Sequence, residues 1–185
     1  MRVITINDHE FQQLCNRLAT AISSDGFSPE CIVGIRNAGA LVAKEIAKFF
    51  PDAHCIEVSV SRPTHKHKNN PTVRSILRLL PLWLLNAMRM AESFIAQFRK
   101  NTSRNANMSL SQSITASRIL IVDDAIDTGA TIELVLNTLA QIAPCSDIRT
   151  AVITVTTPSP SVFCNYALFR NRTLIRFPWA IDAKI

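Results

Sequence analysis

The stretch that most constrains the fold is 119-ILIVDDAIDTGATIELVL-136. Four apolar residues are followed by Asp123 and Asp124, then by a Thr-Gly-Ala-Thr turn, and then by residues with helical spacing. This order of apolar strand, polar turn and helix is typical of a parallel sheet whose helices pack on its faces. We therefore expect the turn at the carboxyl end of a strand, where such sheets bind ligands.

The same alternation recurs on both sides of residues 62–117. Apolar residues three or four apart predict helices, and short uninterrupted or alternating apolar runs predict strands. We predict helices at residues 8–23 (capped by Asn7 or Asp8), 40–49 and 132–142, and strands at 31–35, 54–61, 118–122, 148–155 and 174–177. The expected fold class is α/β, a Rossmann-like parallel sheet with helices on both faces.

Length and composition favour one domain in a reduced compartment. A chain of 185 residues, 48% of them hydrophobic, can bury one sizeable core. We expect a single domain over residues 1–185, with residues 62–117 as an insertion. The five cysteines are scattered and form no C-x-x-C pair, which favours free thiols over disulfides or a zinc site. The polar N-terminal sequence is unlike a signal peptide, so we predict a cytoplasmic protein.

The insertion differs in charge from the rest of the chain. Residues 62–104 contain nine basic residues against one acid, Glu92, although the whole chain carries only +6. This excess favours an anionic partner (phosphates, nucleic acid or a membrane surface), with a solvated charged face as the alternative. The apolar residues 76–98 predict a helix, but charged residues interrupt them too often for a stable membrane span. We expect them to pack on the body or across a homodimer interface, with membrane-surface binding as the alternative.

The turn after the two aspartates has the features of a monophosphate site. Gly129 permits a tight turn, and the first N–H groups of the following helix attract an anion. Thr128 and Thr131 add hydroxyl donors. The carboxylates of Asp123 and Asp124 can accept hydrogen bonds from vicinal hydroxyls, so a sugar phosphate satisfies both parts. The alternative is an Asp-rich strand end followed by a capped helix, without a ligand.

Two segments resemble one known family. The stretch 121-IVDDAIDTGAT-131 closely resembles the 5-phosphoribosyl-1-diphosphate (PRPP) motif of the type I phosphoribosyltransferases, in which a T-G-x-T turn follows two acidic residues. A second stretch, 32-IVGIRNAGALVAKEIA-47, is similar to that family's strand, pyrophosphate loop and helix. The resemblance covers about residues 8–60 and 118–182. It implies the type I phosphoribosyltransferase fold, here with a helical insertion and a small C-terminal hood.

The resemblance also implies roles for individual residues. Asp123 and Asp124 match the pair that holds the ribose hydroxyls. The 5-phosphate loop is matched by Asp127, Thr128, Gly129, Ala130 and Thr131, and the pyrophosphate loop by Arg36, Asn37, Ala38 and Gly39. In the pyrophosphate loop, the family often has a non-proline cis peptide. Arg62, Lys66 and Lys68 fall where the family has a mobile catalytic loop, and they would supply cations to the departing pyrophosphate.

The remaining assignments come from the purine-salvage branch of the family. There an acid at the position of Asp127 approaches N7 of the base and is a candidate proton acceptor. The end of the chain, 175-IRFPWAID-182, is similar to the base-recognition segment, which places Trp179 near the base and Asp182 near a magnesium ion. An ordinary core or hood aromatic is the alternative for Trp179. The sequence departs from the branch at 154-TVTTPSPS-161, which lacks the lysine that bonds the purine's exocyclic oxygen.

The activity implied is a Mg²⁺-dependent transfer of the 5-phosphoribosyl group from PRPP to a nitrogen nucleophile, a nucleobase such as a purine, with release of pyrophosphate. The alternative is a non-catalytic PRPP-sensing regulator that binds nucleic acid. The sequence contains no helix-turn-helix and no RNA-binding aromatic motif, and it has Asp127 and the basic loop. These features favour the enzyme.

Overall fold

The computed structural model describes residues 2–61, 107–109, 114–144, 146–170 and 172–180. The catalytic assignments to Arg62, Lys66 and Lys68, the helix predicted within 76–98, and the metal assignment to Asp182 lie outside the described residues. The described elements are, in order, β1 (Arg2–Thr5), α1 (Asp8–Ser24), β2 (Cys31–Ile35), α2 (Ala38–Ala47), β3 (His54–Ser61), β4 (Asn107–Ser109), β5 (Arg118–Ile126), α5 (Ala130–Ile142), β6 (Asp147–Val155), β7 (Tyr166–Arg170) and β8 (Thr173–Arg176).

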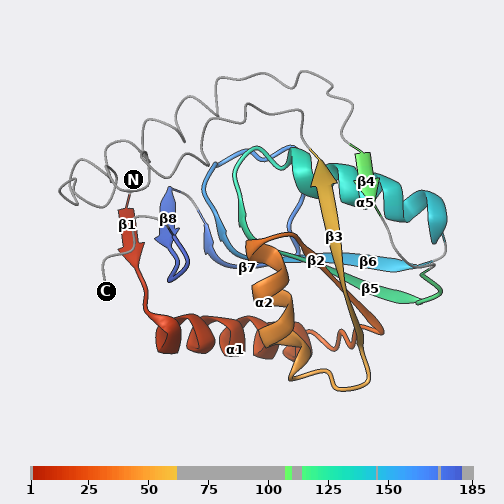
Figure 1. Ribbon diagram of the computed structural model, residues 1–185, viewed down its shortest axis with the longest axis horizontal. Coiled ribbons are helices and arrows are strands. Elements are labelled where there is room, and N and C mark those ends of the chain that lie inside the picture. Colours follow the sequence, from red (N-terminus) through yellow and green to blue (C-terminus); the bar gives the residue numbers. More distant parts are fainter. Residues whose placement is uncertain (1, 62–106, 110–113, 145, 171, 181–185) are drawn as a thin grey trace.

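The central sheet has six strands in the order β4-β3-β2-β5-β6-β7 (Figure 1). The strands from β3 to β7 in this order pair in parallel, and β4 adds an antiparallel edge to β3. From β2 the chain continues outward to β3, whereas from β5 it continues the other way to β6 and β7. The strand order therefore reverses between β2 and β5, and parallel sheets bind ligands at such switch points.

Helices cover both faces of this sheet, as predicted. In Figure 1, α1 and α2 lie on one side of the strands and α5 lies on the other. Ile32 and Leu120 point into the core formed with α1 and α2, whereas Val33 and Ile119 point into the core formed with α5. The inner strands β2 and β5 are buried on both sides because successive side chains alternate between the faces. None of the described helices combines the length and apolarity that a membrane span requires.

The start of α1 shows why the helix begins at residue 8. The Asn7 side chain accepts a hydrogen bond from the Glu10 backbone N–H (2.9 Å), and the Glu10 carboxylate accepts one from the Asn7 N–H (2.8 Å). This reciprocal capping box satisfies two N–H groups that the helix itself cannot bond. Of the two caps considered from the sequence, Asn7 is the correct one.

A small second sheet joins the two ends of the described chain. Strands β1 and β8 pair in parallel, from Arg2 opposite Thr173 to Thr5 opposite Arg176. In Figure 1 they lie together beside the main sheet. The strand predicted at 174–177 is therefore confirmed, but it belongs to this second sheet. The main sheet ends instead with β7, which the sequence analysis missed together with β1.

The cysteines of the described chain are free, as predicted. Cys15, Cys31 and Cys164 are buried, and Cys55 is exposed. Burial raises the pKa of Cys15 to about 12, and the nearby Glu45 contributes to this increase. Burial likewise raises the pKa of Cys31 to about 11. These two thiols therefore stay protonated at neutral pH, and they act as small apolar side chains.

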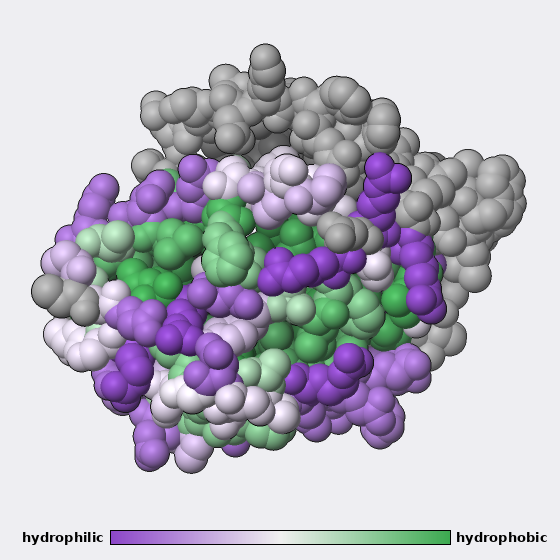
Figure 2. Space-filling model, turned by 180° about the vertical axis from the view of Figure 1, so that it is seen from behind, coloured by the Kyte–Doolittle hydropathy of each residue, from purple (hydrophilic) through white to green (hydrophobic). Residues whose placement is uncertain are grey.

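The face opposite to that of Figure 1 mixes hydrophobic and hydrophilic side chains (Figure 2). Within the described chain, the large apolar side chains that remain exposed belong to separate elements: Leu41 of α2, Phe49 after α2, Ile142 of α5, Phe163 before β7 and Trp179 near the C-terminus. Scattered apolar side chains of this kind are normal on a protein surface. The homodimer predicted from residues 76–98 stays a prediction.

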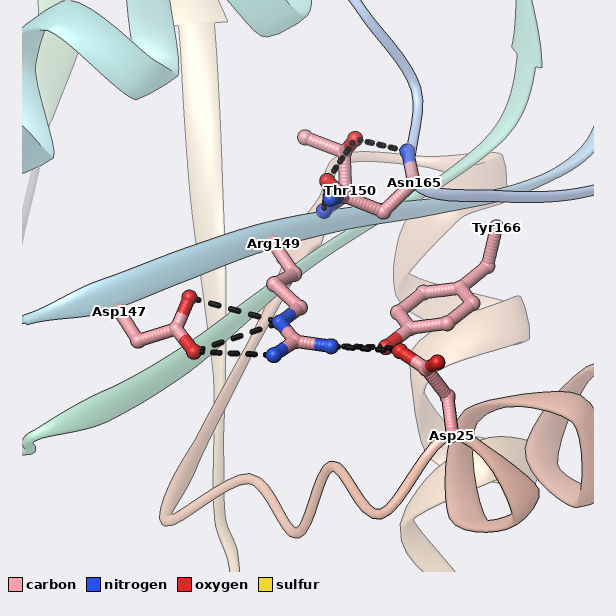
Figure 3. A network of polar contacts seen from close by, with 6 residues as sticks. All are labelled: Asp25, Asp147, Arg149, Thr150, Asn165 and Tyr166. Carbon is pink, nitrogen blue, oxygen red and sulfur yellow. Dashed lines mark hydrogen bonds and ion pairs between the residues drawn. The ribbon is translucent and has the colours of Figure 1, made fainter.

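A polar network fastens the end of α1 to the amino ends of β6 and β7 (Figure 3). Arg149 Nη1 donates to Asp25 Oδ2 (2.6 Å) and to the Tyr166 hydroxyl (2.7 Å), which itself donates to Asp25 Oδ2 (2.8 Å). Arg149 also pairs with Asp147 (3.2 Å), and its guanidinium lies 4.4 Å from the centre of the Phe27 ring. The network therefore anchors the fold at the amino end of the sheet, away from the carboxyl ends of the strands.

Tyr166→Phe should lower the free energy of unfolding by about 1 kcal/mol, because it removes one hydrogen-bonding group and leaves the Arg149–Asp25 pair in place. Urea denaturation measures this loss. Phe163→Leu is the control, since the Phe163 side chain is 77% exposed and its truncation should change little. Equal stability of Tyr166→Phe and wild type would contradict this role of the network.

Candidate functional site

Strand β5 is paired to different lengths on its two sides. Its ladder with β6 runs from Arg118 to Ile126, whereas its ladder with β2 ends where Gly34 pairs with Val122. Residues 123–126 therefore extend beyond β2 at the switch point. The strand was predicted to end at residue 122, and this boundary is wrong because β6 continues to pair with β5. Asp123 and Asp124 lie within β5, beside the chain that leaves β2.

An open pocket of about 1010 Å³ lies at this switch point. Its described lining comes from the ends of β2, β3 and β5, the loop after β2, the start of α2, the start of α5 and the segment after β8. The predicted site residues among this lining are Arg36, Asn37, Ala38, Asp123, Asp124, Asp127, Thr131 and Trp179. The fold thus brings together three segments that are far apart in the sequence.

The loop after β2 packs tightly against the end of β5. The Arg36–Asn37 peptide bond is cis, as the resemblance led us to expect, and α2 begins at Ala38. A Cβ atom on Gly39 would lie 2.8 Å from both the Asp123 Cα and the Val122 carbonyl oxygen. Only glycine allows this approach without displacing backbone. Gly39 is buried and is not part of the pocket's described lining, so its role is to hold the loop against Asp123.

The two adjacent aspartates have different environments. The Asp124 backbone N–H donates to Asp123 Oδ1 (2.9 Å). Loss of hydration raises the pKa of Asp124 above its ordinary value of 3.8, and the negative charge of Asp127 adds to this increase. Hydrogen bonds from Asp123 and from backbone groups act in the opposite direction and only partly offset the burial. The charged form of Asp124 is therefore disfavoured in the free protein, and hydrogen-bond donors from a ligand would stabilise it.

The turn into α5 is shaped by contacts with the loop before β7. Gly129 has φ of 92° and contributes no side-chain cap to α5. A Cβ atom on it would lie 2.8 Å from Ser161 Oγ, and the Ser161 N–H donates to the Thr128 carbonyl (2.8 Å). Thr131 lines the pocket, whereas Thr128, Gly129 and Ala130 form the backbone of the turn. A helix start of this kind is suited to bind an anion such as phosphate.

Asp127 has a neighbour that the sequence analysis did not identify. The Thr156 hydroxyl donates to Asp127 Oδ1 (2.5 Å). Thr156 directly follows β6 and is 1% exposed. Nothing in the sequence Thr-Thr-Pro marks it as a site residue. The β5–β6 register, in which Ile126 pairs with Val155, is the only signal that would have found it.

Trp179 belongs both to an aromatic cluster and to the pocket. Its ring stacks on Phe177, with centroids 4.8 Å apart, and meets Phe11 of α1 edge to face at 4.9 Å. The side chain nevertheless remains 36% exposed and lines the pocket. The two alternatives considered for Trp179 are therefore compatible, because a hood aromatic can present part of its ring to a ligand.

The described part of the site contains no cluster of side chains that would bind a metal ion without a ligand. Among the described residues, no group of three or more His, Cys, Asp or Glu side chains is arranged to hold a metal ion, and Asp182 lies outside them. Magnesium, however, is commonly held through phosphate and hydroxyl oxygens of a substrate with few protein ligands. The pocket, with its acidic wall and helix start, fits an ion that arrives together with a diphosphate.

Comparison with known proteins places the chain in a family. The family model described as phosphoribosyl transferase domain matches residues 4–179, and the chain therefore belongs to the phosphoribosyltransferase family. The predicted family, fold class and enzyme class are confirmed at this level. No curated protein sequence matches the chain significantly.

Several solved structures share the fold. The purine phosphoribosyltransferase from Pyrococcus horikoshii Ot3 has a TM-score of 0.67 at 18% identity, over 100% of this chain and 98% of that one. The xanthine-guanine-hypoxanthine phosphoribosyltransferase of Helicobacter pylori has 0.66 at 15% identity, over 98% and 95%. A hypothetical protein from Neisseria gonorrhoeae with bound ppGpp has 0.62 at 13% identity, over 96% and 89%. At these identities the similarity concerns the fold alone.

Asp124→Asn should stabilise the protein in the absence of ligand, because it removes a charge that burial disfavours. Since the folded-state pKa of Asp124 is raised, the gain is complete above that pKa. The gain in stability shrinks as the pH falls through the folded-state pKa. It vanishes below 3.8, where Asp124 is protonated in both the folded and the unfolded state. Thermal unfolding at a series of pH values measures the gain. A variant that is less stable than wild type at pH 7 would contradict the assigned cost.

Proposed function

We propose that the protein is a Mg²⁺-dependent enzyme that transfers the 5-phosphoribosyl group from PRPP to a nitrogen atom of a nucleobase and releases pyrophosphate. The observation that carries this proposal is the single pocket at the switch point. It combines the loop after β2, the two aspartates at the end of β5 and the start of α5. These are the parts that a ligand with a diphosphate, vicinal hydroxyls and a monophosphate requires.

Each part of PRPP has a chemically suitable partner in the pocket. The 5-phosphate would lie at the start of α5, where Thr131 and backbone N–H groups provide donors. The ribose hydroxyls would donate to the carboxylates of Asp123 and Asp124, which relieves the burial cost of Asp124. The diphosphate would lie along the loop after β2, next to the exposed Arg36.

The arrangement supports catalysis mainly by positioning. Departure of pyrophosphate leaves positive charge on the ribose ring, and fixed carboxylates beside the ring stabilise such a charge. Bound magnesium would neutralise part of the charge on the leaving diphosphate. Asp127, in the turn that leads into α5, would accept the proton of the attacking nitrogen. We also propose that Arg62, Lys66 and Lys68 approach the pyrophosphate and that Asp182 contributes to the ion.

The acceptor is the least determined part of this proposal. Trp179 gives the pocket an aromatic wall on which a base can stack. Two proteins of similar fold are named for purine substrates, which supports purines as the first class to test. The segment 154–161 contains no lysine or arginine, so this segment itself supplies no cation for an exocyclic oxygen.

The predicted surroundings of the enzyme complete the proposal. We propose that residues 1–185 form one domain, with residues 62–117 as its insertion, and that the protein acts as a cytoplasmic homodimer. The alternative of a nucleic-acid-binding regulator rests on the basic residues between 62 and 104. All of these lie outside the described residues, so no structural observation favours it.

The ribose assignment predicts that Asp123→Asn combined with Asp124→Asn weakens PRPP binding at least about tenfold, because each charge-assisted hydrogen bond contributes roughly 1.5–3 kcal/mol. Calorimetry with PRPP and Mg²⁺ measures the affinity. The matched control is Asp147→Asn, which neutralises an exposed carboxylate at the amino end of β6 and should leave the affinity unchanged. Unchanged affinity in the double variant would remove the basis for the ribose assignment.

The acceptor assignment is tested by pyrophosphate release across purines, pyrimidines and related nitrogen nucleophiles. We expect turnover with at least one nucleobase, dependent on both PRPP and Mg²⁺. The chemical class of that base then shows which groups Asp127 and Trp179 contact. PRPP binding without pyrophosphate release for any acceptor would refute the catalytic proposal and favour a PRPP sensor.

A further inference from the structure

Thr156 is fixed in place by every polar group that it carries. Its backbone N–H donates to the Ile126 carbonyl (2.9 Å), which continues the β5–β6 ladder by one residue. Its carbonyl accepts from the Arg172 N–H (3.1 Å) just before β8. With 1% of its surface exposed, the residue has little room to move. Its hydroxyl is therefore held at a defined point beside the pocket.

That hydroxyl is directed at a residue of the pocket. Thr156 Oγ1 donates to Asp127 Oδ1 (2.5 Å) and lies 3.3 Å from the Ile126 carbonyl oxygen. Asp127 itself is exposed and lines the pocket. A fully buried donor thus contacts one oxygen of an exposed carboxylate, and this contact restricts the rotation of an otherwise mobile side chain.

The described groups near Asp127 leave its negative charge unpaired by a cation. Asp124 lies on β5, the strand that ends just before Asp127. Arg36 lines the pocket from the loop after β2, and Glu133 on the first turn of α5 accepts a hydrogen bond from Ser161 (2.8 Å). Among the residues that the structure describes, Asp127 forms no ion pair, and its side chain accepts a hydrogen bond from the neutral Thr156 hydroxyl. Its negative charge is therefore left for a donor on the ligand.

We propose that Thr156 is a positioning residue of the transfer reaction. It holds one oxygen of Asp127 so that the other accepts the proton of the acceptor nitrogen. The inference rests on the proposed function. Because the hydroxyl is neutral, it orients Asp127 without cancelling its charge. This arrangement selects acceptors that present an N–H group to Asp127 and disfavours acceptors that need a cation at this position.

The test compares Thr156→Val with Thr156→Ser and with Thr157→Val. Thr157 is the adjacent threonine, also buried, and its hydroxyl does not contact Asp127 in the structure. Thr156→Val should lower kcat about 10- to 100-fold, because proton transfer depends on the orientation of the base. The KM for PRPP should stay within about threefold of wild type, since the lost contact acts in the transition state. Thr156→Ser should restore most of kcat, and Thr157→Val should leave it unchanged.

Coupling to Asp127 decides between positioning and a general structural effect. In an Asp127→Asn background, Thr156→Val should lower kcat less than about twofold, because the residue it positions is already altered. An equal loss in both backgrounds, a loss shared by Thr157→Val, or no rescue by serine would overturn the proposal.

Failure of the proposed function gives a different result. In that case wild type itself releases no pyrophosphate. The hydrogen bond between Thr156 and Asp127 is then tested by measuring the free energies of unfolding of the same variants. Non-additive losses for Thr156→Val and Asp127→Asn would confirm the hydrogen bond and support the positioning of Asp127. Additive losses would overturn the inference independently of activity.

Discussion

The site depends on the unequal pairing of β5. Its ladder with β6 continues to Ile126, whereas its ladder with β2 stops at Val122. After β2 the chain therefore stops pairing with β5. It packs against the end of β5 instead, because Gly39 has no Cβ and its backbone can lie close to the backbone of Val122 and Asp123. One strand thus supports two aspartates and stays rigid through β6, while its other side opens onto the pocket. A rigid support on one side and an open side on the other are what a site with fixed carboxylates requires.

The electrostatics of the site favour a ligand over the empty state. Burial raises the pKa of Asp124 and disfavours its charged form, and the negative charge of Asp127 adds to this effect. Binding sites often carry such unfavourable groups, because hydroxyl donors or a cation arriving with the substrate convert the cost into affinity. The amino end of the sheet has the opposite character. There Arg149, Asp25 and Tyr166 satisfy one another, which is typical of groups that stabilise the fold.

The sequence predicted the parts of the fold that have strong local patterns. The apolar runs of β2, β3 and β6 and the helical spacing of α1 each identify an element, and the acidic pair and its turn identify residues that line the pocket at the switch point. Short strands such as β1 and β7 were missed, because they are only partly buried and depend on pairing with distant segments. The Thr156–Asp127 contact was missed for the same reason. It is created by strand register, and no local pattern encodes it.

The central claim is that one ligand spans the pocket from the loop after β2 to the start of α5. A crystal structure of the protein with PRPP and Mg²⁺ tests this most directly. We expect the ribose hydroxyls against Asp123 and Asp124, the 5-phosphate on the backbone N–H groups that follow Gly129, and the diphosphate next to Arg36. A ligand bound elsewhere, for example in the smaller pocket lined by Glu30 and His54 at the amino ends of β2 and β3, would contradict the account.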